Sequence, residues 1–286
     1  MTICIASICA GGKAIVAASD RMVTAEFLAM EFEHPGSKIE KLDGTCVGLT
    51  AGDALAATEL FAAAPKRGDC WLSPDEEDPE NDAEAQTEGD EVNFWTVEVV
   101  AESIATTYAR VRNRKAEERY LRPRGLTLDS FYSGGVITHL PESLAVMLDS
   151  QIQQSGLGVE AMVAGIDDSG AHIYAVTEPG AVTCMDRLGY HAIGSGLLHA
   201  LLALVGTEHS LTNTLNETVF QVYEAKRRAE VAQGVGHATE IVIVTADGVR
   251  FLSEKDQKEL DGIYVRKTAP KTRAIRSAVE NLPYGN

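Results

Sequence analysis

The chain has 286 residues, of which 45% are hydrophobic and 23% are charged. These values are typical of a globular protein with one large domain or two small ones and a sizeable core. The formal net charge of −17 at pH 7 argues against binding to nucleic acid or to an anionic membrane. No apolar stretch is long enough to span a membrane, and no basic region precedes the short apolar segment Ile3 to Ala10, so that a signal peptide is not expected. We therefore expect a soluble, cytoplasmic protein.

Cysteine usage gives no sign of cross-links. The five cysteines are scattered along the chain without a C-x-x-C pair: Cys4, Cys9, Cys46, Cys70 and Cys184. An odd number without such spacing predicts reduced thiols, mostly in the core, rather than a disulfide framework or a zinc site. The seven histidines show no H-E-x-x-H or comparable ligand spacing. We expect no metal and no cofactor.

The first fifty residues are strand-like. Two pairs of short apolar runs each flank a turn, which predicts two hairpins: Ile3 to Ile8 with Ala14 to Ala18 around Gly11-Gly12, and Lys38 to Leu42 with Cys46 to Thr50 around Asp43-Gly44. The runs of the first pair do not alternate with polar residues, so we expect both faces of these strands to be covered.

A helix and an acidic insertion follow. The pattern of Ala54 to Ala64 is helical and ends at Pro65. Between Asp69 and Glu91 lie eleven acidic residues and no basic one. We expect a solvated, flexible insertion at about 66–92; a partner-docking segment is the alternative.

Helices and then strands return in the middle of the chain. Apolar residues recur every three to four positions from Phe94 to a point before Pro123, which predicts a long helix. A second helix is expected from Pro141 to Gln154, since proline is favoured in a first helical turn. Ala161 to Ile166 and Ile173 to Val176 then form a predicted hairpin.

The last part of the pattern contains two helices and a final hairpin. Gly194-Ser195-Gly196 leads into Leu197 to Val205, a helix that is apolar nearly all round and is therefore expected to be buried. A capping box at Thr214 to Glu217 begins the next helix. Ile241 to Val244 and Phe251-Leu252 flank a turn at Asp247-Gly248.

Strands that are grouped apart from paired helices predict an α+β fold rather than βαβ units. Helices inserted in pairs between strand groups suit two stacked sheets with a helix layer on each outer face. We expect one domain over residues 1–253 and a C-terminal extension over 254–286. The tail from Gly262 has five basic residues, one acidic residue and no helical or strand period, so it is expected to be disordered or to wrap a neighbouring subunit.

The residue that carries most chemical information is Thr2. Removal of Met1 would leave a threonine whose hydroxyl and free α-amine share one residue, which is a nucleophile with its own base. The amine, with a pKa of about 8, can accept the hydroxyl proton at neutral pH. Such a site also needs a lysine that lowers the pKa of the amine and relays protons. A carboxylate must hold that lysine, and backbone N–H groups must face the oxyanion.

Four further positions fit these needs. Lys38 is the candidate lysine, and Asp20 is the candidate carboxylate, because the first hairpin would bring the end of its strand beside Thr2. Gly52 lies where a strand turns into a helix, which suits an exposed N–H group. Ser195, between two glycines, can place a hydroxyl nearby. Each residue alone also fits a structural role, as a solvated cation, a surface acid, a loop glycine or a helix start; the combination favours catalysis.

Thr2 to Thr50 contains the nucleophile, a glycine hairpin, Ile15 to Arg21 and Ser37 to Glu40. This order resembles the opening of the proteasome β-subunit family of N-terminal nucleophile hydrolases, which includes HslV and Anbu proteins. The separation of Lys38 from Gly52 also resembles the separation of the lysine and the oxyanion glycine in this family. Further similar segments extend the resemblance to about Ser253: Phe94 to Asn113, Ala164 to Asp167 and Ile193 to Gly196.

The resemblance implies a four-layer αββα sandwich of the N-terminal nucleophile hydrolase type and a threonine-type endopeptidase. It also implies a self-compartmentalising ring or helical homo-oligomer, peptide or unfolded-protein substrates, and an ATP-dependent unfoldase as a partner. By this resemblance, Thr2 is the nucleophile, Lys38 is the proton relay, and Asp20 orients Lys38. Gly52 donates to the oxyanion, and Ser195 supports the terminal amine. Thr50 and Ala54 line the substrate pocket, where their small side chains leave space for a larger substrate side chain.

Several alternatives stay open. The first hairpin is about two residues longer than in the family, so Ser19 competes with Asp20 for the carboxylate position. The family places an Asp and a Ser before the strand at Ile241, where this chain has Gly234 to Thr239; His237 or Thr239 could substitute. The chain could also be a catalytically silent ring subunit, or an amidase of the same class that acts on a small amide. We expect no propeptide, so that activation requires only removal of Met1.

Overall fold

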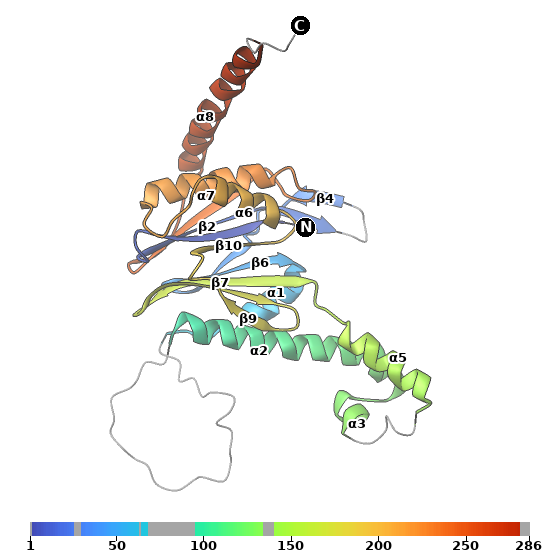
Figure 1. Cartoon of the computed structure of the whole chain (residues 1–286). Coiled ribbons are helices and arrows are strands. Elements are labelled where there is room, and N and C mark those ends of the chain that lie inside the picture. Colours follow the sequence, from blue (N-terminus) through green and yellow to red (C-terminus); the bar gives the residue numbers. More distant parts are fainter. Residues whose placement is uncertain (1, 26–29, 63, 68–94, 134–139, 281–286) are drawn as a thin grey trace, which may run out of the picture.

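The computed structural model describes residues 2–25, 30–62, 64–67, 95–133 and 140–280, and it combines helices with β-strands (Figure 1). The mixed α and β content predicted from the sequence is confirmed. The acidic insertion predicted at about 66–92 lies almost wholly outside the described residues, as does Cys70. No helix in the described part of the chain is long and apolar enough to cross a membrane.

One five-stranded sheet contains the start of the chain. Its strands in spatial order are β10 (Tyr190–Ile193), β1 (Cys4–Cys9), β2 (Ala14–Asp20), β11 (Thr239–Thr245) and β12 (Gly248–Phe251). The predicted first hairpin is confirmed, with Cys4 opposite Ser19. Asp20 in turn lies opposite Thr239. The start of β1, the end of β2 and the start of β11 therefore meet at one end of this sheet.

The second five-stranded sheet contains the other predicted hairpins. Its strands in spatial order are β5 (Ile39–Asp43), β6 (Cys46–Gly52), β7 (Val159–Asp167), β8 (Gly170–Thr177) and β9 (Ala181–Cys184). The hairpins at Asp43-Gly44 and at 167–170 are confirmed. A separate two-stranded sheet, formed by β3 (Met22–Ala25) and β4 (Met30–Glu33), follows β2 directly. These two short strands and β9 were not predicted from the sequence.

Helices cover the outer faces of the two large sheets (Figure 1). The helices in chain order are α1 (Ala54–Phe61), α2 (Val97–Ala116), α3 (Leu128–Tyr132), α5 (Glu142–Gln153), α6 (Leu197–Gly206), α7 (Leu215–Ala229) and α8 (Glu254–Glu280). Of these, α1 and α2 pack on one sheet, and α6 and α7 pack on the other. A π-helical segment (Glu117–Leu121) and a 3₁₀ turn (Arg122–Arg124) extend α2 through Pro123. The capping box at Thr214 is confirmed, because the side chain of Thr214 accepts from the Glu217 N–H while the Glu217 carboxylate accepts from the Thr214 N–H.

Three apolar clusters hold the two large sheets and the helices α1, α2, α6 and α7 together. One lies between the two sheets and includes Ala17, Leu49 and Val242. A second joins the sheet of β1 and β2 to α6 and α7, and a third joins the sheet of β6 and β7 to α1 and α2. β1 and β2 are buried along their whole length. The prediction that both faces of these strands are covered is confirmed.

The prediction that the helix at Leu197 to Val205 is buried is wrong in part. Its inner face packs on α7 and the first sheet through residues such as Ala200 and Leu204. The opposite face of α6 is not covered by the described residues, and its Leu198, Leu202 and Val205 side chains are 59–62% exposed. These three residues are spaced four and three positions apart, so they form one stripe along α6.

The C-terminal extension was expected to lack regular structure, and it instead forms α8, which extends away from the sheets (Figure 1). Ser253 and Asp256 cap its start reciprocally, since the Asp256 carboxylate accepts from Ser253 and the Asp256 N–H donates to Ser253 Oγ. Leu260 and Tyr264, four residues apart, pack against the cluster that contains α7. The wrapping of a neighbouring subunit stays a prediction.

Candidate active site

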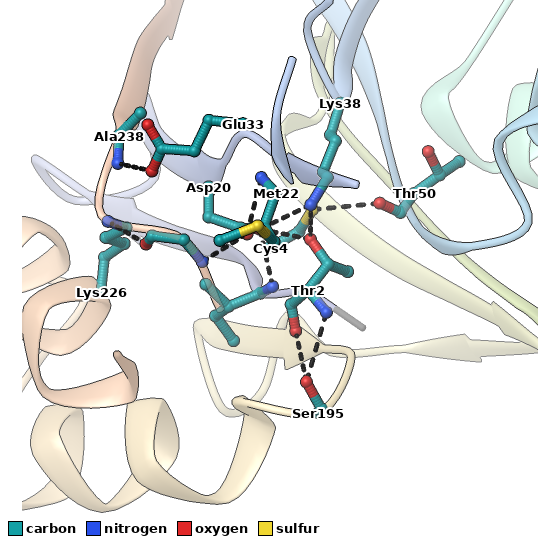
Figure 2. A network of polar contacts seen from close by, with 12 residues as sticks. Thr2, Cys4, Asp20, Met22, Glu33, Lys38, Thr50, Ser195, Lys226 and Ala238 are labelled. Carbon is teal, nitrogen blue, oxygen red and sulfur yellow. Dashed lines mark hydrogen bonds and ion pairs between the residues drawn. The ribbon is translucent and has the colours of Figure 1, made fainter. Parts of the chain in front are cut away.

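Thr2, Asp20 and Lys38 converge at one end of the two sheets (Figure 2). Thr2 precedes β1, Asp20 ends β2, and Lys38 directly precedes β5. The Lys38 ammonium donates to Thr2 Oγ1 and, at 2.8 Å, to Asp20 Oδ1. The Thr2 hydroxyl also contacts Asp20 Oδ1 as a donor. The structure therefore brings together the nucleophile, the lysine and the carboxylate that the sequence predicted.

Asp20 is the most heavily hydrogen-bonded member of this group, and its side chain is fully buried. Its donors are Thr2 Oγ1, the Ile3 N–H at 3.0 Å and Lys38 Nζ on Oδ1, and the Met22 N–H at 3.1 Å and the Gly236 N–H at 2.9 Å on Oδ2. Burial alone would raise the pKa of this carboxyl. The charge of Lys38 and the bonds from Lys38, Thr2 and Gly236 outweigh burial and hold the pKa below its usual value. Asp20 is therefore ionised at neutral pH.

Ser195 lies beside the main chain of Thr2. The Thr2 nitrogen, which is the amide nitrogen that joins Thr2 to Met1, donates to Ser195 Oγ at 3.2 Å. The close fit requires glycine at position 194. Its φ is +95°, and a Cβ atom on this residue would lie 2.5 Å from the Thr2 carbonyl oxygen. Ser195 is thus next to the atom that would become the terminal amine. We call Thr2, Asp20, Lys38 and Ser195 the Thr2 site.

Strand β6 borders the Thr2 site. The Thr50 N–H donates to the Lys38 carbonyl at 3.2 Å, and the Thr50 carbonyl accepts from the Cys4 thiol at 3.3 Å. Gly52 ends this strand with φ of +112°, and a Cβ atom there would lie 1.9 Å from the Gly158 carbonyl oxygen. Ala54 begins α1 two residues later. The oxyanion role of Gly52 and the pocket roles of Thr50 and Ala54 stay predictions.

The structure brings Asp20, and not Ser19, to Lys38. Successive side chains of a strand point to opposite faces, so Ser19 points away from the face that Asp20 occupies. Ser19 Oγ is buried, and among the described residues it has no hydrogen-bond partner. The extra length of the first hairpin therefore leaves the carboxylate in the expected place.

The loop at 234–239 contributes main-chain groups rather than the side chains that the sequence suggested. The His237 ring contacts Glu230 at 2.8 Å, and Thr239 Oγ1 donates to the His237 carbonyl. The group that reaches the Thr2 site is the Gly236 N–H, which is bonded to Asp20. Sequence reasoning missed this donor. It also missed Lys226, whose position in the apolar stripe of α7 between Val222 and Ala229 was the available signal.

Cys4 is the one cysteine of the described residues that adjoins this site. Its side chain is fully buried, and burial raises the pKa of the thiol to about 12, although the Lys38 charge opposes the shift. The thiol is therefore protonated at neutral pH and is a poor nucleophile. Cys4 therefore does not compete with Thr2 as the nucleophile.

No family model matches the chain, and no curated protein is significantly similar to it. The functional conclusion therefore depends on the geometry of the Thr2 site and on the sequence motifs that this site unites.

Proposed function

We propose that this chain is a threonine-type N-terminal nucleophile hydrolase of the proteasome β-subunit kind, which cleaves amide bonds of peptides or unfolded proteins through an acyl-enzyme. The observation that carries the proposal is the contact of the Lys38 ammonium with both Thr2 Oγ1 and Asp20 Oδ1. A purely structural Lys–Asp pair needs no hydroxyl between its partners. It also needs no serine at the Thr2 nitrogen, which favours the catalytic interpretation.

The chemistry requires a free amine at Thr2. As Thr2 Oγ1 bonds to the substrate carbonyl carbon, its proton passes to this amine, and the Lys38 ammonium stabilises the developing charge on the oxygen. The C–N bond of the tetrahedral intermediate then breaks, and the amine gives its proton to the leaving nitrogen. Water, deprotonated by the same amine, attacks the carbonyl carbon of the resulting ester. The bond between this carbon and Oγ1 then breaks, the amine returns the proton to Oγ1, and the carboxylic acid product leaves. Asp20 holds Lys38 in place throughout.

Other parts of the structure support this assignment. Gly52 would offer its N–H group to the oxyanion, and Thr50 and Ala54 would line the pocket for the substrate side chain. We propose that the two facing sheets with their outer helices are the four-layer αββα sandwich of this hydrolase class. The three apolar clusters between successive layers support that interpretation.

The resemblance of the sequence also supports a cytoplasmic ring or helical homo-oligomer that works with an ATP-dependent unfoldase. Native mass spectrometry of the purified protein tests the assembly. A single mass that corresponds to a monomer at all concentrations would contradict it.

Hydrolysis by Thr2 variants tests the function. With a fluorogenic peptide and an unfolded protein as substrates, Thr2→Ala is expected to lower turnover by about 10³-fold or more, while Thr2→Ser keeps a measurable rate. Size-exclusion chromatography should give the same assembly for all three proteins. Equal rates for wild type and Thr2→Ala would contradict the proposal. Cleavage of small amides alone would favour the amidase, and a complete lack of cleavage with Met1 retained would favour the silent subunit.

A further inference from the structure

The loop that supplies the Gly236 N–H to Asp20 is itself held by a buried cation. The Lys226 side chain on α7 is fully buried. Its ammonium donates to Glu230 Oε1 at 2.7 Å and to the carbonyls of Gly236 and His237, each at 2.8 Å. Three acceptors satisfy the three donors of a lysine. A charge that is this deeply buried is tolerated only with such partners.

Gly236 connects this cation to the Thr2 site. Its carbonyl accepts from Lys226, and its N–H donates to Asp20 Oδ2 at 2.9 Å (Figure 2). The two polar groups of one residue therefore link the ammonium to the carboxylate that holds Lys38. We propose, on the basis of the proposed hydrolase function, that Lys226 is a positioning residue that fixes the main chain at Gly236 and thereby the orientation and charge of Asp20.

Two further features hold the same loop next to Asp20. The loop is fixed from its other side by Glu33, which accepts the Ala238 N–H at 2.7 Å. Gly236 itself fits closely, since a Cβ atom there would lie 3.0 Å from the Met22 side chain. The two carbonyl contacts tie Lys226 to the loop at Gly236 and His237, whereas an ion pair that only stabilised α7 would make no contact outside the helix.

The consequence for Asp20 has a definite sign. Without the ammonium, the Gly236 and His237 carbonyls lose their donor, the main chain at Gly236 is held less firmly, and the N–H bond to Asp20 weakens. A carboxylate that loses a donor has a higher pKa. Asp20 then takes up a proton at a higher pH, and its hold on Lys38 is lost in the same range.

The test compares Lys226→Met with Arg228→Met. Both residues lie on α7, and each forms an ion pair at 2.7 Å with a glutamate four positions away, but Arg228 pairs with Glu224 and not with the loop. Two readouts are measured in the full chain: the pH titration of the Gly236 amide proton by NMR, which follows the ionisation of Asp20, and the pH dependence of peptide hydrolysis.

Lys226→Met is expected to raise the midpoint of both titrations by about 0.5–1 pH unit. It should lower kcat by about 10-fold and change KM by less than about 2-fold, because substrate binding is not involved. Arg228→Met should leave both midpoints unchanged. Equal midpoints for Lys226→Met and the wild type would overturn the proposal.

If Lys226→Met does not fold, Lys226→Met/Glu230→Gln removes the carboxylate that the single variant leaves buried, and the same shift is expected. The NMR titration needs no hydrolytic activity. A wild-type protein that hydrolyses no peptide would therefore refute the proposed function, while the amide titration would still decide the role of Lys226.

Discussion

The Lys38 ammonium lies 2.8 Å from Asp20 Oδ1, although Asp20 ends a strand of one sheet and Lys38 directly precedes a strand of the other. The pair joins the two sheets at the end where Thr2 precedes β1. Asp20 is fully buried, and the Lys38 side chain is 15% exposed. A pair that is this well shielded from water affects stability and reactivity together.

Loss of the Lys38 charge tests both effects. Lys38→Met is expected to lower hydrolysis by about 10²–10⁴-fold, since the charge that stabilises the reacting oxygen of Thr2 is removed. It is also expected to lower the free energy of unfolding by about 3–5 kcal/mol, because a buried carboxylate loses its cation. Lys41→Met, an exposed position on β5, the strand that Lys38 precedes, is the control and should change stability by less than about 0.5 kcal/mol. Denaturant unfolding and peptide hydrolysis measure the two quantities; wild-type rates in Lys38→Met would contradict the assignment.

The depressed pKa of Asp20 predicts a pH dependence of stability. Burial opposes the shift, but Lys38 and the hydrogen bonds keep the folded pKa below the unfolded value of about 3.9. The unfolded chain therefore binds more protons between the two values. The contribution of Asp20 to the free energy of unfolding is therefore fully present above about pH 4–5, and it is lost as the pH falls through the folded pKa.

Asp20→Asn removes this dependence. Thermal unfolding between pH 7 and pH 3 should show a shallower loss of Tm in the variant than in the wild type. Parallel curves for the two proteins would show that Asp20 does not have the lowered pKa.

Much of the candidate site could be predicted because it depends on local signals. The turn at Gly11-Gly12 sets the register that places Cys4 opposite Ser19, and this register puts Thr2 near Asp20. The Asp43-Gly44 turn similarly places Lys38 at the start of a strand. What the sequence could not show is that the two hairpins lie in different sheets and meet at the same end, since packing between sheets leaves no periodic pattern.

The missed features also have physical reasons. The exposed stripe of α6 was missed because a helix that is apolar on all sides gives no information about which face is covered. The helical tail was missed because Gly262 and Pro270 both disfavour helix, whereas the capping pair at Ser253 and the packing of Tyr264 on α7 act in its favour. Lys226 was missed because a lysine is usually solvated, and only the fold shows the carbonyls that surround it.

The backbone at Gly52 should tolerate no side chain. Gly52→Ala combines a positive φ of 112° with a Cβ atom 1.9 Å from the Gly158 carbonyl oxygen. We expect destabilisation of at least about 1–3 kcal/mol and loss of hydrolysis. Gly12→Ala has φ of +83° and open space around its Cβ atom, so it should show the strain of a positive φ, about 1–2 kcal/mol, without loss of activity. Unfolding and hydrolysis assays on both variants separate the loss of stability from the loss of activity. A fully active Gly52→Ala would refute the oxyanion role proposed for Gly52.

Thiol labelling should distinguish the cysteines. Cys4 is buried with a pKa raised to about 12, whereas Cys184 is exposed. With iodoacetamide at pH 8, the native protein should be modified at Cys184, and Cys4 should react only after unfolding. Peptide mapping by mass spectrometry gives the sites. Reaction of Cys4 in the native protein at the rate of Cys184 would contradict the protected environment described for it.

Mass spectrometry of the N-terminal peptide after treatment with a peptide epoxyketone tests the central claim most directly. This reagent can bond to both the hydroxyl and the α-amine of a terminal threonine. The account predicts a peptide that begins at Thr2, lacks Met1 and carries one adduct, with no such adduct in Thr2→Ala. A hydrolytically active protein that retains Met1, or an adduct on another residue with Thr2 unmodified, would contradict it.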